Sequence, residues 1–328
     1  MKAIKILTMA AMATAVFASC SNEDGLPQSN YPADNVVRIM TSVDGMNTRA
    51  SYGNSADKLK SFGFCIKNAN SEKYTYDNIK VSQKGYNWIP ATQMLWQNST
   101  TAVDILAYAP YQETTEDANG KVKVFGKTDY AFSVKEDQSN AEDYSSDLIV
   151  FKQTGFTPVL ELNTSKAVEV AFTHLLSQLN LIIELRDQFN TNNNTVTKGF
   201  VTDVKVNGTI ISSKVDFSAS PISVQVDGTQ TAAITPETTG FTPAENATAH
   251  AVFNYSAIVI PQTVAAGNFS ISFKVNNTEY IWTATDAVTF ESGKKHELHL
   301  LAGKDVVQGG AISAIPWGDE TITEKETD

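Results

Sequence analysis

The stretch that decides the fold class is Phe269-Ser270-Ile271-Ser272-Phe273-Lys274-Val275. Its apolar residues fall at every second position, which puts all of them on one face of a β-strand and leaves the other face to water. Asn276-Asn277 follows as a turn signal, and Tyr280, Ile281 and Trp282 then form a second apolar run. The segment therefore predicts a β-hairpin with one buried face.

Short apolar runs of the same kind recur along the chain and predict further strands at 36–43, 59–67, 102–109, 121–125, 148–152 and 257–260. Asn207-Gly208, between Val206 and Ile210, predicts a second hairpin turn. Residues 172–185 fit an amphipathic helix, but the alternation from Leu179 to Leu185 favours a strand. The sequence thus predicts an all-β fold with mostly antiparallel sheets.

The length of the chain indicates how many domains it can form, and its charge indicates which partners it can bind. The chain has 328 residues, which is long enough for two sandwich-sized domains. Its net charge of −11 repels phosphate. Nucleic acid is therefore not an expected partner. A polar stretch after Pro158 places the expected boundary near 166–170, giving an N-terminal domain at 36–168 and a C-terminal domain at 169–328.

The N-terminus is typical of an export signal. Lys2 and Lys5 precede an apolar run at 6–16 that is too short to span a membrane, and Phe17-Ala18-Ser19-Cys20 follows. This ending resembles a bacterial lipobox, which predicts a signal peptide at 1–19, a lipidated Cys20 and a polar tether at 20–35. The alternative is an ordinary signal peptide cut nearby, with Cys20 incidental.

The second cysteine has no expected partner if Cys20 is acylated. Cys65 lies in Phe62-Gly63-Phe64-Cys65-Ile66, an apolar strand-like run, and this favours a small buried side chain. We therefore expect no disulfide.

Residues that could carry catalysis or bind metal do not form a known pattern. His296 and His299 are three positions apart, so on a strand they point to opposite faces, and we expect no metal site. His174 lies among leucines and is expected to be a hydrogen-bonded structural histidine. The acids at 136–147 could bind calcium or cleave a glycoside, but a solvated loop is the simpler interpretation. With no nucleophile or phosphate-loop motif, the sequence predicts neither enzyme activity nor a cofactor.

A polar stretch at 47–51 suggests a different covalent event. Asn47-Thr48-Arg49-Ala50-Ser51 lies between the first two expected strands, and such a loop is accessible to a protease. Cleavage between Arg49 and Ala50 would separate the strand at 36–43 from the remainder of the chain.

Several of these motifs together resemble the fimbrillin family, the type V pilins of Gram-negative anaerobes. In chain order they are the lipobox at 17–20, Thr48-Arg49-Ala50, Leu106-Ala107-Tyr108-Ala109-Pro110, Phe172-Thr173-His174-Leu175 with Gln178-Leu179, Ile260-Pro261-Gln262, Phe290-Glu291-Ser292-Gly293-Lys294-Lys295-His296 and Ile315-Pro316-Trp317.

The resemblance implies two transthyretin-like antiparallel β-sandwich domains and a lipidated precursor on the surface of the outer membrane. It also implies that an arginine-specific protease removes the strand at 36–49 by cutting the bond between Arg49 and Ala50. Assembly with other pilin subunits into a fimbrium then follows by donor-strand exchange. The candidate donor strand lies at 306–322.

A second hypothesis stays open: a non-polymerising surface lipoprotein that binds glycans or adheres to host or microbial surfaces. Trp88, Trp96 and Trp282 could stack on sugars, although packing within the fold is the simpler expectation. The two hypotheses differ at Arg49, because only the first requires cleavage there.

Overall fold

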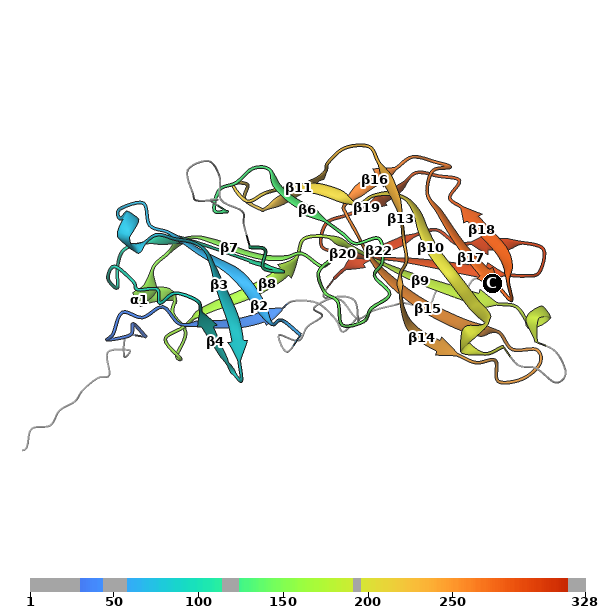
Figure 1. Cartoon of the computed structure of the whole chain (residues 1–328), viewed down its shortest axis with the longest axis horizontal. Coiled ribbons are helices and arrows are strands. Elements are labelled where there is room, and N and C mark those ends of the chain that lie inside the picture. The colour runs from blue at the N-terminus through green and yellow to red at the C-terminus, as the bar shows by residue number, and fades with distance from the viewer. Residues whose placement is uncertain (1–29, 44–57, 114–123, 191–195, 318–328) are drawn as a thin grey trace, which may run out of the picture.

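The computed structural model describes residues 30–43, 58–113, 124–190 and 196–317. Figure 1 shows an elongated arrangement with the first strands at one end and the C-terminal strands at the other. The helical elements in these ranges are all short, and none is long and apolar enough to cross a membrane. They are α1 (Pro158–Glu161), η1 (Glu72–Tyr74), η2 (Asp187–Phe189) and η3 (Lys198–Phe200). The prediction of an all-β fold is confirmed.

A seven-stranded sheet lies at the N-terminal end, in the order β1-β8-β7-β5-β2-β3-β4. Its strands are β1 (Ile39–Val43), β2 (Ser61–Lys67), β3 (Tyr76–Lys84), β4 (Asn87–Pro90), β5 (Val103–Ala109), β7 (Ile149–Phe156) and β8 (Val168–His174). β1 and β8 run parallel, whereas the other neighbours in this sheet are antiparallel. The boundary expected between 168 and 169 falls at the beginning of β8.

Two larger sheets and one strand pair lie at the C-terminal end. The four-stranded sheet contains β13 (Thr231–Ile234), β10 (Val201–Ile210), β17 (Ser270–Val275) and β18 (Thr278–Thr283). The six-stranded sheet contains β14 (Glu237–Thr242), β15 (Ala251–Val259), β9 (Ser177–Leu185), β20 (Lys294–Ala302), β21 (Val307–Gly309) and β22 (Ser313–Pro316). The pair is β16 (Gln262–Val264) and β19 (Val288–Phe290). The strand predicted from Leu179 is confirmed as part of β9.

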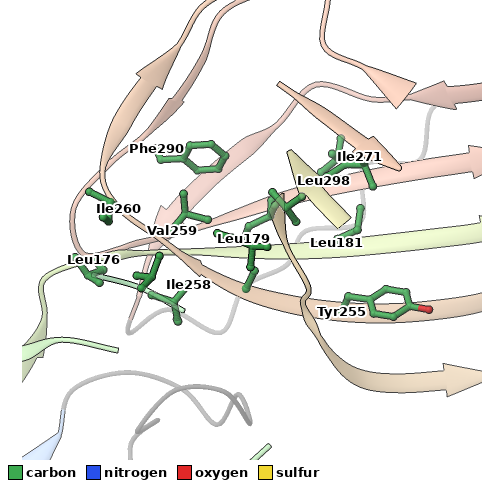
Figure 2. Packing of buried hydrophobic residues seen from close by; sticks show 14 of the residues in the cluster. Leu176, Leu179, Leu181, Tyr255, Ile258, Val259, Ile260, Ile271, Phe290 and Leu298 are labelled. Atoms are coloured by element: carbon green, nitrogen blue, oxygen red, sulfur yellow. The ribbon is translucent and has the colours of Figure 1, made fainter. Parts of the chain in front are cut away.

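The C-terminal core lies between the two larger sheets. Figure 2 shows Leu179 and Leu181 of β9 gathered with Leu298 of β20 and Ile271 of β17. All four side chains are at most 1% exposed. The alternation that decided the fold class is therefore the alternation that fills this core.

A three-stranded sheet joins the two ends. It contains β12 (Ser223–Val226), β11 (Ser212–Asp216) and β6 (Tyr130–Ser133), so a strand from the first half of the chain pairs with two strands from the second. Near it, the Lys152 ammonium donates hydrogen bonds to the carbonyl oxygens of Phe217, Ser218 and Ala219 at 2.8, 2.9 and 2.8 Å. The two ends are thus tied by backbone pairing and by a half-buried cation.

The two hairpin predictions had different outcomes. Asn276 and Asn277 connect β17 to β18 with φ of 47° and 67°, as a tight hairpin turn requires, and this prediction is confirmed. The hairpin predicted at Asn207-Gly208 is wrong, because β10 continues through both residues. The ladder with β13 shifts register between Val206 and Thr209, so Gly208, at φ 92°, belongs to a bulge.

The other predicted strands agree in place more than in length. The strand at 148–152 continues to Phe156 in β7, and the one at 257–260 is the end of the longer β15. The strand predicted at 121–125 lies partly outside the described residues, and Val124 and Phe125 are not in a strand. Cys65 is fully buried and has no disulfide partner in the described ranges.

Candidate functional site

β1 occupies the edge of the seven-stranded sheet. It pairs in parallel with β8 from Ile39 opposite Val168 to Val43 opposite Phe172. Val37, Ile39 and Val43 are 2%, 6% and 6% exposed, whereas Arg38 and Ser42 face water. This alternation is the one that a strand with one buried face requires, and it shows that β1 and the residues just before it fill an apolar groove.

The floor of this groove is the N-terminal core. The buried side chains of Val168, Val170 and Phe172 on β8 belong to the same cluster as the inward residues of β1. The rings of Phe62 and Phe172 meet edge to face with centroids 5.3 Å apart. Removing β1 would therefore expose apolar side chains and leave one edge of β8 without its partner.

The segment before β1 is held by a few specific contacts. The Val37 N–H donates to the Met94 carbonyl at 3.0 Å, and the Trp96 N–H donates to the Asn35 carbonyl at 2.8 Å. Arg38 pairs with Asp34 at 2.7 Å and lowers the pKa of that carboxyl to about 2. The Arg38–Asp34 pair is local and exposed and adds little, whereas the two backbone hydrogen bonds tie the segment to residues near Met94, and the buried face of the strand adds to this attachment.

Three of the residues singled out in the sequence cannot be placed. Cys20 lies before the described residues, and Arg49 and Ala50 lie in the range 44–57 that is also outside them. The described chain stops at Val43, the last residue of β1, and resumes at Lys58 before β2. Both predictions about covalent modification at these residues remain predictions.

The candidate donor segment lies at the edge of the six-stranded sheet. β21 pairs with Leu300–Ala302 of β20, and β22 pairs with Lys294–Glu297 of the same strand. Between them residues 310–312 belong to neither strand, although the Gly310 N–H still donates to the His299 carbonyl at 3.1 Å, and all residues from Val306 to Pro316 are exposed or half-buried. Residues 318–322 of the segment lie outside the described part of the chain.

Trp317 differs from the rest of this segment. Its indole is 4% exposed and stacks on the His174 ring at the end of β8, with centroids 4.0 Å apart and an interplanar angle of 5°. His174 Nδ1 lies 2.9 Å from Asp147 Oδ1, and both side chains are fully buried. The prediction of a hydrogen-bonded structural histidine is confirmed. Two motifs far apart in sequence thus meet in one cluster.

The acids at 136–147 do not behave as one solvated loop. Asp137 accepts hydrogen bonds from Ser139, and Asp143 pairs with Lys135 at 2.5 Å, so both carboxylates have local partners. Asp147 is buried against His174. The interpretation of a solvated loop is therefore wrong for Asp147, because a histidine distant in sequence pairs with it.

His296 and His299 lie on opposite faces of β20, as expected. His296 is 1% exposed, accepts a hydrogen bond from the Glu291 N–H at 3.0 Å, and has its pKa lowered by burial. His299 is on the open face, 2.6 Å from Glu184. In the part of the chain that the structure describes, no group of three or more His, Cys, Asp or Glu side chains is placed to hold a metal ion.

The tryptophans considered for sugar stacking pack against other rings. Trp96 is 3% exposed and stacks on Phe156 with centroids 5.7 Å apart. Trp88 meets Phe62 edge to face at 5.1 Å, and Trp282 is half-buried. These contacts favour a structural role for the indoles.

The comparisons with known proteins agree with the motif order. A family model described as fimbrillin-like matches residues 48–317. No curated protein matches the chain.

Three solved structures with a similar fold come from Bacteroides species. A fimbrial protein of Bacteroides vulgatus has 19% sequence identity and a TM-score of 0.51, covering 85% of this chain and 99% of that one. A Bacteroides uniformis protein whose name proposes a role in cell adhesion has 19% identity and a TM-score of 0.57, covering 87% and 99%. A Bacteroides ovatus protein named in the same way has 14% identity and a TM-score of 0.59, covering 88% and 100%. At these identities the likeness concerns the fold.

Proposed function

The chain belongs to the fimbrillin-like family, and from this premise we propose that it is a structural or accessory fimbrial subunit that serves cell adhesion. It is exported as a lipoprotein precursor, cut between Arg49 and Ala50, and assembled with other subunits by donor-strand exchange. The observation that carries the proposal is the position of β1, an edge strand that fills an apolar groove and directly precedes the stretch containing Arg49.

The energetics of β1 suit a strand that is stable but exchangeable. Val37, Ile39 and Val43 are buried, and each such side chain contributes about 1.5–3 kcal/mol. Their combined contribution is comparable to the roughly 5–15 kcal/mol stability of a whole domain. The empty groove would therefore be costly, and a strand from another subunit that pairs with β8 would be bound strongly.

Cleavage is the step that makes exchange possible. While the chain is intact, β1 returns to its groove at a very high effective concentration. Once the bond at Arg49 is cut, only non-covalent contacts hold β1, and a competing strand can replace it. The lipid anchor at Cys20 leaves together with β1.

The N-terminal residue of the assembled protein tests this proposal directly. Fibres isolated from the surface of the native host are expected to contain chains that begin at Ala50, by N-terminal sequencing or mass spectrometry of each band. Chains in the fibre that begin at an acylated Cys20 would show that assembly does not require cleavage. The non-polymerising adhesive lipoprotein would be the better description if the protein forms no fibre at all.

The membrane anchor is tested by changing its attachment residue. Cys20→Ala removes the thiol that the lipid is expected to modify, so the precursor should lose acyl mass and remain uncleaved or leave the membrane fraction. Mass spectrometry of membrane and soluble fractions provides the measurement. Cys65→Ala is the control, because the buried Cys65 should not affect fractionation. An acylated Cys20→Ala chain would place the lipid elsewhere.

A further inference from the structure

We infer that Trp317 is a latch that retains the C-terminal segment, residues 307–317, on its own subunit, with the buried His174–Asp147 pair as its seat. The inference rests on the proposed function, because it concerns the availability of the candidate donor strand. It assigns a role to three residues from different parts of the chain. They are His174 at the end of β8, Asp147 just before β7, and Trp317, the last residue that the structure describes.

The contact between Trp317 and His174 is the best packed part of the segment. The rings are nearly parallel at 4.0 Å, and the backbone N–H of Trp317 donates to the Gly293 carbonyl at 3.1 Å. Asp147 fixes the orientation of the imidazole through Nδ1. The indole therefore docks on a platform that is already held in place by the fold.

The backbone of the remainder of the segment is hydrogen-bonded on one side only, and on the other side the Trp282 ring lies over Gly309 while Val307 and Ile312 pack partly buried against the core. The segment's backbone pairs with β20, while residues 309–312 and Ala314 border an open cleft of about 630 Å³ against the β18–β19 side of the domain. Ser313, Ala314 and Pro316 are exposed. Few buried side chains resist peeling of β21 and β22 from β20, so Trp317 provides a large share of their retention.

The seat also contains features of a contact that can open. The Trp317 Nε1 and the His174 Nε2 are both buried, and neither has a hydrogen-bond partner among the described residues. A buried polar group without a partner is unfavourable, and this cost is recovered when water reaches the group. The stack thus holds the segment, while hydration of the two nitrogen atoms would favour its release. This combination suits a segment that must stay on the subunit until assembly.

Hydrogen exchange on the full-length chain tests the latch without any need for polymerisation. Trp317→Ala is expected to increase exchange of the β21 and β22 amides by on the order of 100-fold or more, because it removes a large buried side chain. Exchange of the central β9 amides should stay unchanged. Trp317→Phe keeps a stacking ring and is expected to produce about a 10-fold effect or less.

The control is Val306→Ala, since Val306 is 51% exposed and precedes β21. It should leave exchange in both strands unchanged. Unchanged exchange of β21 and β22 in Trp317→Ala would overturn the latch, as would an equal increase in β9, which would indicate general destabilisation. If the strands loosen as expected but cleaved chains polymerise no faster, the latch stands and the donor assignment in the proposed function fails.

Discussion

Replacing Arg49 with alanine is expected to give a folded, lipid-anchored monomer that forms no heat-resistant polymer. β1 would stay covalently connected to β2 and would occupy its groove in parallel with β8, as in the intact chain. An incoming strand must then compete with an intramolecular strand, whose effective concentration is in the millimolar range or above. Loss of assembly should therefore be close to complete. The measurement is a denaturing gel of unboiled surface extracts, with the N-terminus of each band sequenced.

Two matched variants separate cleavage from charge. Arg49→Lys keeps the positive charge but removes the side chain that an arginine-specific protease recognises, so it should behave like Arg49→Ala. Arg38→Lys changes an exposed arginine directly before β1 and should be cleaved and assembled as the natural chain is. Polymers of full-length Arg49→Ala chains would contradict the role of cleavage. Wild-type chains that are cut but remain monomeric with their natural partners would favour a tip subunit or an adhesin.

Local signals in the sequence were sufficient for part of the strands and for the buried face of β1. The period of two in 269–275 and the paired asparagines after it predict β17, β18 and the turn between them, because these features depend on neighbouring residues alone. The same period of two marks Val37, Ile39 and Val43 as the buried residues of β1 and of the segment just before it. It fails at Asn207-Gly208, where a bulge in a long strand uses the same residue types as a hairpin turn.

Contacts between distant segments could not be predicted in this way. The parallel pairing of β1 with β8 joins residues more than a hundred positions apart, and no local pattern specifies which strand lies at an edge. The stack of Trp317 on His174 and the burial of Asp147 depend on three segments that meet only in the folded chain. Motif order along the sequence did connect His174 and Trp317 to one family, but it could not show that they touch.

Removing the C-terminal segment is expected to have the second large effect. Whereas Arg49→Ala prevents cleavage, this deletion should permit cleavage and prevent donation of a strand. A chain ending at Val306 lacks β21, β22 and Trp317, yet it keeps β1, β8 and the groove between them. It should be cleaved at Arg49 and accept a strand, but it has none to donate. Alone it should stay monomeric, and mixed with the wild-type chain it should end growing polymers and shorten the ladder on an unboiled gel.

Because this deletion also uncovers the seat on His174, a full-length variant is needed to separate lost donation from lost stability. Ile312→Asp with Ile315→Asp places charges on a segment whose apolar residues would have to enter the groove of another subunit, where an unpaired carboxylate is strongly unfavourable. In its own subunit both positions are only half-buried, so thermal unfolding should change little. A chain ending at Trp317 lacks residues 318–328, which comprise five acids and six other residues including Ile322, and it should still donate if the donor strand lies within 307–317. Ladders of normal length from the double aspartate variant would exclude this segment as the donor, and loss of ladders from the chain ending at Trp317 would move the donor toward Ile322.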